Sequence, residues 1–238
     1  MRVFDFDSTI YDGESLFDLY LFSVRYEPRV LRYIAPVINC GIRYKIGKAQ
    51  LGQMERKLDP IIHRYLKDLS ASKRLGRARR KSWTGKNTTS LFEPNPLAPT
   101  GASAADAPAV ANLAVGHTDH KGLDALSALF WNRKFRKIKS WYVPQPDDVI
   151  ITASFDLTVG EACRRLGVNH LIASTIDPET LEISYLNFST NKVRRFREIY
   201  GEDAVIDEFY TDSRHDQPMI DIARKAYLVK GDKVIRIK

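Results

Sequence analysis

Cysteine is scarce in this chain of 238 residues, which contains only Cys40 and Cys163. Two distant cysteines exclude a disulfide scaffold and a cysteine-based zinc site, because both need paired spacings. Their scarcity fits a reducing compartment. The chain begins almost directly with a predicted strand, so we expect no signal peptide. We therefore expect a cytoplasmic protein.

Long uninterrupted apolar segments are also missing. The longest apolar stretch runs from Val30 to Ile46, and Arg32, Pro36, Arg43 and Lys45 interrupt it. It is too short and too charged to cross a membrane as a helix. We interpret it as a pair of core-facing helices. The alternative is a surface that lies against the inner face of an anionic membrane.

Acidic residues are missing from one segment. Between residues 73 and 86 there are seven Lys and Arg residues and no Asp or Glu. Removing these seven charges from the net charge of +8 leaves +1 for the rest of the chain. The basicity is therefore local. Such a run is usually a solvated or disordered segment, and contact with nucleic acid or anionic lipid is the less favoured alternative.

The composition changes between about residue 71 and residue 123. After the basic run, Pro, Ala, Gly, Ser and Thr dominate, and a segment of this composition buries little apolar surface. We predict a disordered insert, first basic and then Ala/Pro-rich, at about 71–123. We interpret His117 and His120 within it as exposed side chains, with a metal-binding pair as the alternative.

The rest of the sequence predicts an α/β fold. Residues 2–6 are expected to form a short buried strand, and helical spacing of apolar residues follows it. In the second half, strands and helices alternate, which predicts a Rossmann-like, doubly wound, mainly parallel sheet with a helical cap inserted after the first strand. We assign residues 1–13 and 145–238 to the core and residues 14–144 to the cap.

The expected elements of the second half have short spans. They are strands at 147–152, 170–173 and 208–211, helices at 159–166, 191–200 and 218–225, and hairpins within 176–185 and 227–237.

Two carboxylates follow the first predicted strand. Asp5 and Asp7 are two positions apart, so alternation along a strand sends both side chains to the same side. Open α/β sheets bind ligands at the carboxyl ends of their strands. One carboxylate can then attack a substrate while the other transfers protons. The alternative is a solvated turn.

Three later segments are expected to reach the same edge of the sheet. Thr152 ends a buried strand, Lys192 begins a helix, and Asp212 and Asp216 follow another short strand. Four carboxylates do not stay ionised close together without a cation. Their oxygens favour a hard ion, and Mg²⁺ also binds phosphate oxygens. With Thr152 and Lys192 as donors to an anion, these residues predict a phosphoryl-transfer site.

Taken in order, these segments resemble the four motifs of the haloacid dehalogenase superfamily, in the branch (subfamily IB) that is similar to phosphoserine phosphatase. The motifs are Asp5-Phe6-Asp7-Ser8-Thr9, Ile150-Ile151-Thr152-Ala153-Ser154, Asn191-Lys192-Val193-Arg194 and Asp212-Ser213-Arg214-His215-Asp216. The resemblance covers residues 1–20 and 126–238 well, and it does not extend to 71–123. It implies a Mg²⁺-dependent phosphomonoesterase that forms an aspartyl-phosphate and acts on a small phosphorylated metabolite.

The resemblance implies a role for each matching residue. Asp5 would be the nucleophile, and Asp7 the general acid and later the base. Asp5, Asp212 and the backbone carbonyl of Asp7 would bind Mg²⁺. The residues expected to hold the phosphoryl group are Ser8, Thr9, Thr152 and Lys192.

Three further residues are expected to support the reaction. Asp216 would orient Lys192 or a water on the metal, with Ser213 beside it. Glu14 matches a position that faces the substrate, and the alternative is an acid at the start of a helix, which the helix dipole favours.

The substrate is less well defined than the reaction. The longest interval between motifs falls between Asp7 and Thr152, which in this family indicates a helical cap of the first type. No basic cap residue matches the one expected to bind phosphoserine. One alternative is a lipid phosphate similar to phosphatidylglycerophosphate, presented by an anionic membrane. Another is an inactive relative that binds nucleic acid through residues 73–86. The sequence does not predict the oligomeric state.

Overall fold

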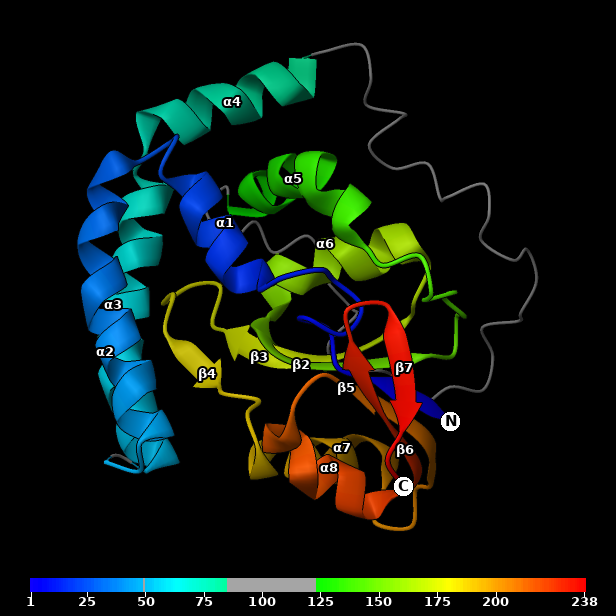
Figure 1. Ribbon diagram of the computed structural model, residues 1–238. Helices are drawn as coiled ribbons and strands as arrows, with labels where there is room; N and C mark the ends of the chain where they lie inside the picture. The colour runs from blue at the N-terminus through cyan, green and yellow to red at the C-terminus, as the bar shows by residue number, and fades with distance from the viewer. Residues whose placement is uncertain (49, 85–122) are drawn as a thin grey trace.

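The computed structural model of the protein describes residues 1–48, 50–84 and 123–238. Within them, strands form one sheet in the order β4-β3-β2-β1-β5-β6-β7 (Figure 1). The strands are β1 (Arg2–Phe4), β2 (Val149–Phe155), β3 (His170–Ile176), β4 (Ile183–Tyr185), β5 (Ile206–Thr211), β6 (Ala223–Lys230) and β7 (Lys233–Arg236).

The central strands of the sheet all run in the same direction. β3, β2, β1, β5 and β6 are parallel, whereas β4 and β7 join the two edges as antiparallel strands. β1 is in the middle of the sheet, where Val3 pairs with both Val149 and Phe209. The predicted α/β fold with a mainly parallel sheet is confirmed.

Helices cover both faces of this sheet. Figure 1 shows α5 and α6 on one face and α7 and α8 on the other. The helices are α1 (Ser15–Ser23), α2 (Ile34–Lys45), α3 (Leu51–Ser70), α4 (Lys73–Thr84), α5 (Leu123–Lys134), α6 (Asp156–Leu166), α7 (Thr190–Tyr200) and α8 (Gln217–Ile222), with 3₁₀ turns η1 (Pro28–Tyr33), η2 (Phe135–Lys137) and η3 (Arg214–Asp216).

The helices α1 to α4, here called the cap segment, lie between β1 and β2 in the chain, where the cap is predicted. α2 and α3 pack together at the β4 edge of the sheet (Figure 1). Asp59 of α3 accepts a hydrogen bond from the amide of Ile183 in β4 at 2.8 Å. Within the described residues, none of the helices combines the length and the hydrophobicity needed to cross a membrane.

Alternating residues of the strands contribute to two apolar clusters, one on each face of the sheet. Val3 and Ile151 belong to the cluster on the α7 and α8 face, whereas Phe4 and Ile150 belong to the other. This second cluster continues into the cap segment as far as Leu75. The predicted boundary between core and cap is therefore crossed by continuous apolar packing, and the division into two domains stays a prediction.

The predicted disorder of the insert is wrong for its first part, because residues 73–84 form α4. Lys and Arg are good helix formers, and Leu75 supplies an apolar side chain that the helix buries against the second cluster. Ser72 holds the start of α4, since its hydroxyl donates to the carbonyl of Tyr26 at 2.7 Å. Residues 85–122, with His117 and His120, lie outside the described residues.

The predicted helix at 218–225 is also too long. α8 ends at Ile222, and β6 begins at Ala223, which pairs with Ile206 of β5. Ala226 pairs with Phe209 in the same ladder and is fully buried. Pairing with a neighbouring strand overrides the local helical pattern, because the sheet buries these small side chains.

Candidate active site

The loop after β1 carries Asp5 and Asp7 at the carboxyl edge of the sheet. The amide of Asp5 donates to the carbonyl of Tyr210 in β5 at 2.8 Å, which extends the strand pairing by one residue. Ser8 then turns the chain with φ of 55°, and its amide donates to the carbonyl of Gly13 at 2.8 Å. Gly13 has φ of 131°, a conformation that favours glycine. The turn places the start of α1 next to Asp7.

Lys192 links Asp5 to Asp216. Its Nζ donates to Asp5 Oδ1 and to Asp216 Oδ2, each at 2.9 Å. Thr211 Oγ1 also donates to Asp216 Oδ2 at 2.9 Å. The three charged residues are buried, which makes their pairing necessary.

The electrostatics of this buried group favour a charged lysine. Burial lowers the pKa of Lys192, but the carboxylates of Asp5 and Asp216 outweigh it, and the pKa of the lysine is raised. Burial also raises the pKa of Asp5 well above its ordinary value, and Lys192 opposes that effect. The ammonium group thus supplies a fixed positive charge where a phosphoryl group would react.

Asp7 is held by two serines. Its Oδ1 accepts a hydrogen bond from the amide of Ser15 at 2.6 Å, and its Oδ2 accepts one from Ser154 Oγ at 2.5 Å. Burial raises the pKa of Asp7, and the hydrogen bonds from these serines oppose the rise. The carboxyl group therefore has a fixed orientation and an environment that favours its protonated form more than water does.

The two serine hydroxyls also contact each other. Ser15 Oγ and Ser154 Oγ are 3.2 Å apart, and either can be the donor. A hydroxyl both donates and accepts. Ser154 can therefore donate to an ionised Asp7 and, with its proton turned to Ser15, accept from a protonated Asp7. This suits a group that gives up a proton and later takes one back.

An irregularity in β2 brings Thr152 and Ser154 to the site. The strand continues beyond Thr152, where the sequence predicts its end, and its register with β3 shifts between Ile151 and Phe155. Such bulges redirect side chains near active sites. Thr152 Oγ1 accepts from the Ser154 amide at 3.1 Å, and the Thr152 carbonyl accepts from Asn187 Nδ2 at 2.9 Å.

These side chains share one cavity of about 780 Å³. Its volume falls within the usual range of small-molecule sites. The polar end is lined by Asp5, Asp7, Thr152, Lys192, Asp212 and Asp216. The structure thus brings together residues that lie up to 211 positions apart in the sequence.

The acidic residues have the donor chemistry of a magnesium site. Asp5 contacts Lys192 through Oδ1, and within the described residues its Oδ2 makes no hydrogen bond. Burial, and then the charge of Asp216, raise the pKa of Asp212. In the part of the chain that the structure describes, no three His, Cys, Asp or Glu side chains already form a metal site. The available hard oxygens nevertheless fit Mg²⁺.

Some predicted site residues are placed elsewhere. Neither Ser8 nor Thr9 is among the residues that line the cavity. Thr9 is fully buried beneath the loop, and its hydroxyl has no hydrogen-bond partner among the described residues. The Ser8 hydroxyl donates to Glu14 at 3.1 Å. Glu14, predicted to face the substrate, and Ser213, predicted to support the site beside Asp216, both line the cavity.

Lys139, which no sequence pattern predicts, supports the loop that carries the site. It is buried, and its Nζ donates to the carbonyl oxygens of Ser8 and Gly231, the latter at 2.8 Å. Burial lowers the pKa of Lys139. The lysine therefore ties the loop that carries Asp5 and Asp7 to the turn between β6 and β7. No local pattern marks it, because its partners are distant backbone atoms.

Comparisons with known proteins provide little beyond the fold. No protein family and no curated protein matches this chain. A solved structure from Bordetella pertussis Tohama I, described as a protein with unknown function, is 16% identical, with a TM-score of 0.57; the match covers 95% of this chain and 87% of that chain. This likeness supports the α/β fold.

Two other solved structures are similar at lower scores. One is a HAD family hydrolase from Salmonella enterica serovar Typhi, 12% identical, with a TM-score of 0.45 and coverage of 93% of this chain and 59% of that one. The other is a phosphoserine phosphohydrolase-like protein from Francisella tularensis, 14% identical, with a TM-score of 0.41 and coverage of 95% and 86%.

Proposed function

We propose that the protein is a Mg²⁺-dependent phosphomonoesterase of the haloacid dehalogenase type, similar to subfamily IB, with Asp5 as its nucleophile. The observation that carries this proposal is the buried arrangement at the carboxyl edge of the sheet. Lys192 donates a hydrogen bond to Asp5 there, and Asp7 lines the same cavity in a fixed orientation. A nucleophile, a fixed cation and an oriented acid are the parts that phosphoryl transfer to a carboxylate needs.

In the first step, a carboxylate oxygen of Asp5 attacks phosphorus and forms a new O–P bond. The bond between phosphorus and the alcohol oxygen breaks, and Asp7 gives its proton to that oxygen. Lys192 stabilises the negative charge on the transferring group. Thr152 Oγ1 accepts from the Ser154 amide, so its own proton is available to a phosphoryl oxygen.

In the second step, water attacks the phosphorus of the aspartyl-phosphate. Asp7, now ionised, takes a proton from this water. The bond between Asp5 and phosphorus breaks, which releases inorganic phosphate and regenerates the carboxylate. The paired hydroxyls of Ser15 and Ser154 follow the change in protonation of Asp7 by reversing their own hydrogen bond.

The residues that would hold Mg²⁺ are Asp5, Asp212 and the backbone carbonyl of Asp7. When bound, the ion supplies positive charge that offsets the carboxylates and the phosphate. Asp216 already accepts hydrogen bonds from Lys192 and Thr211, so we assign it to positioning the lysine.

The lining of the cavity disfavours phosphoserine as the substrate. Among the described residues that line it, Lys192 is the only Lys or Arg, and two carboxylates already pair with it. A substrate with a second anionic group would therefore find no free Lys or Arg among these residues. Contact with an anionic membrane and a cytoplasmic location stay predictions. Nucleic-acid binding through residues 73–86 remains the least favoured alternative.

Hydrolysis of p-nitrophenyl phosphate tests the proposed reaction. We expect turnover to require Mg²⁺, to stop with a chelator, and to fall by more than about 1,000-fold in Asp5→Asn. Asn fits the same space, so the thermal unfolding temperature should change little. The matched control is Asp12→Asn, which alters an exposed residue of the same loop and should leave turnover unchanged. Turnover by Asp5→Asn at the wild-type rate would rule out the aspartyl-phosphate.

A further inference from the structure

The cavity has a second end with a different character. Away from the carboxylates, it runs along α1, α2 and α3 of the cap segment. Its wall there includes Leu16, Phe17, Ile34, Val37, Ile38 and Ile62. The cavity is continuous, so one ligand can touch the reactive carboxylates and this apolar wall together.

Large apolar residues at the mouth of the cavity remain accessible to solvent. Phe17 is 46% exposed, Val37 39% and Ile38 48%, although each lines the cavity. Exposed apolar side chains that gather at a cavity are typical of a binding surface, because an apolar ligand would remove them from water.

The tyrosines of the wall do not offer free hydroxyls to a polar substrate. Tyr20 donates to the carbonyl of Val30 at 2.6 Å, Tyr33 donates to Asp68 at 2.8 Å, and Tyr65 donates to Ser23 at 3.1 Å. Their hydroxyl groups are therefore engaged within the cap segment itself. What the tyrosines add to the cavity is mainly aromatic surface.

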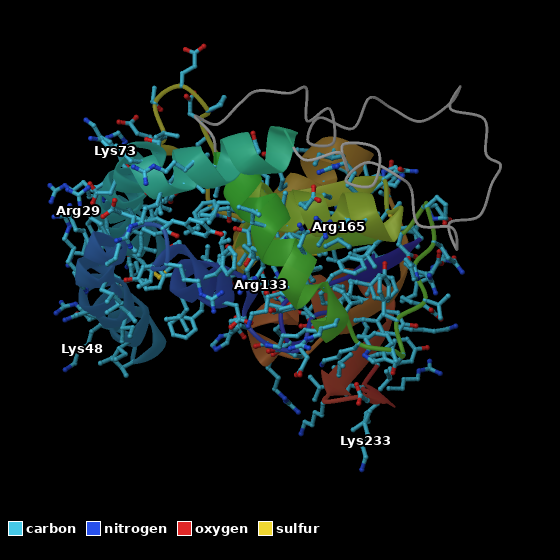
Figure 2. The ribbon with its side chains drawn as sticks, turned by 90° about the horizontal axis from the view of Figure 1, so that it is seen from above. Arg29, Lys48, Lys73, Arg133, Arg165 and Lys233 are labelled. Carbon is cyan, nitrogen blue, oxygen red and sulfur yellow. The ribbon has the colours of Figure 1, made fainter. Side chains whose placement is uncertain are left out.

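The positive charges of the cap segment lie outside this wall. Figure 2 shows Arg29, Lys48 and Lys73 at the outer side of the cap segment, away from the sheet. None of the three is among the residues that line the cavity. The wall thus offers apolar contact without a charged partner for a polar substituent.

We propose that this wall binds the apolar chain of a phosphomonoester substrate whose phosphate lies at Asp5. This inference deepens the proposed function and rests on it for the position of the phosphate. The substrate class is a phosphate joined through its ester oxygen to a hydrocarbon chain, either a free single-chain phosphate or a lipid in a bilayer.

Chain length gives the first test, in binding and in turnover. Butyl and octyl phosphonate carry a C–P bond that the enzyme does not hydrolyse, so their Kd, measured by calorimetry, reports binding alone. Full burial of a methylene is worth up to about fourfold in affinity. We expect octyl phosphonate to bind at least tenfold more tightly than butyl phosphonate. Equal affinities would overturn the inference.

A matched pair of variants locates the chain. Ile38 and Ile42 lie one turn apart on α2 and are 48% and 53% exposed, but only Ile38 lines the cavity. We expect Ile38→Gln to weaken octyl phosphonate binding about fivefold or more and to leave butyl phosphonate nearly unchanged. Ile42→Gln should change neither. Equal losses in the two variants would contradict the proposed wall.

The second pair uses α1 in the same way. Phe17 and Leu21 are 46% and 45% exposed, and Phe17 alone lines the cavity. Phe17→Gln should again reduce the preference for the longer chain, whereas Leu21→Gln should not. Both residues are accessible, so these variants are expected to fold.

Hydrolysis of butyl and octyl phosphate separates failure of this inference from failure of the proposed function. If hydrolysis depends on Asp5 and kcat/KM is equal for both esters, the proposed phosphatase activity is supported and the proposed binding of an apolar chain is rejected. Preferential binding of octyl phosphonate without hydrolysis of any ester would support the wall and reject the phosphatase.

Two presentations of the substrate distinguish its source. The first is octyl phosphate below its critical micelle concentration, and the second is phosphatidic acid in phosphatidylcholine vesicles. Faster hydrolysis of the monomer indicates a free single-chain phosphate, and faster hydrolysis in vesicles indicates a membrane lipid. Either result supports a chain-binding wall, whereas a preference for glycerol 3-phosphate over both would overturn it.

Discussion

The two ends of the cavity differ in the kind of interaction that they offer a ligand. At the end that carries the carboxylates, Lys192 pairs with Asp5 and Asp216, and Asp7 accepts two hydrogen bonds. At the other end, residues such as Ile38 are half exposed and lie open to the cavity. The hydrogen bonds at the first end are preorganised for one distribution of charge. The second end exposes apolar surface, which any apolar group of suitable size can cover.

This difference predicts that the proposed reaction and the choice of substrate are separable in this protein. In the proposed reaction, directional hydrogen bonds at the carboxyl edge of the sheet act on charge that appears only during reaction, so changes there should lower kcat. Apolar contact acts equally on bound substrate and transition state, so changes in the wall should alter affinity and chain preference. The following variants test whether the two ends are independent.

The largest effect is expected for Asp7→Asn, which removes the proton donor. We expect kcat for octyl phosphate to fall by about 100- to 10,000-fold. The loss should be smaller for p-nitrophenyl phosphate, whose leaving group needs less protonation. Affinity for octyl phosphonate should stay within about twofold of the wild type. A parallel loss of that affinity would show that the two ends are coupled.

Lys192→Gln should destabilise the fold, because it leaves the carboxylates of Asp5 and Asp216 buried together without a cation. We expect a loss of about 3 kcal/mol in the free energy of unfolding at pH 8, measured with urea.

The loss of stability in Lys192→Gln should depend on pH, because the unpaired carboxylates are buried. Unpaired buried carboxylates have a higher pKa in the folded than in the unfolded protein, so the deficit should grow as pH rises above about 4. Less destabilisation is therefore expected at pH 5 than at pH 8. A deficit that is the same at both pH values would argue against burial of these charges, and Lys192→Arg should restore part of the stability.

A buried carboxylate at the opposite edge provides a structural contrast. Asp148 accepts two hydrogen bonds from Arg2 at 2.8 Å each and one from Tyr142 at 3.0 Å, just before β2 begins. Asp148→Asn should lower the free energy of unfolding by about 2 kcal/mol. Its kcat and its chain preference should match the wild type below the unfolding transition. A loss of kcat would mean that the site depends on this distant edge.

The smallest effect is expected for Ser154→Ala. Loss of one hydrogen bond to Asp7 should reduce kcat about tenfold. That bond favours the ionised carboxylate, so its removal should raise the pKa of Asp7 further. Because the acid must be protonated, the alkaline fall in kcat should move to higher pH. Ser154→Thr should restore the wild-type profile, and an unshifted profile in Ser154→Ala would reject this role.

Much of the candidate site could be predicted because its residues follow strand ends. Asp5 and Asp212 come directly after β1 and β5, Asp7 follows Asp5 by two residues, and the topology of a parallel sheet brings such positions together. Ser154 could also be predicted to lie near the site, since it follows Thr152 by two residues on the same strand. No sequence pattern marks Ser15 or Lys139, because Ser15 contacts Asp7 through its backbone amide and Lys139 contacts distant backbone carbonyls.

The sequence alone determined the mainly parallel α/β fold and the acidic residues at its carboxyl edge, since periodicity and motif order are local properties of the chain. Tertiary structure decided which groups hold Asp7, why Thr9 is buried away from the cavity, and where the apolar side chains of the cap segment face. Those outcomes depend on contacts between residues far apart in the chain. Helical spacing shows that Ile38 belongs to an apolar face, but only packing shows that this face opens onto the carboxylates.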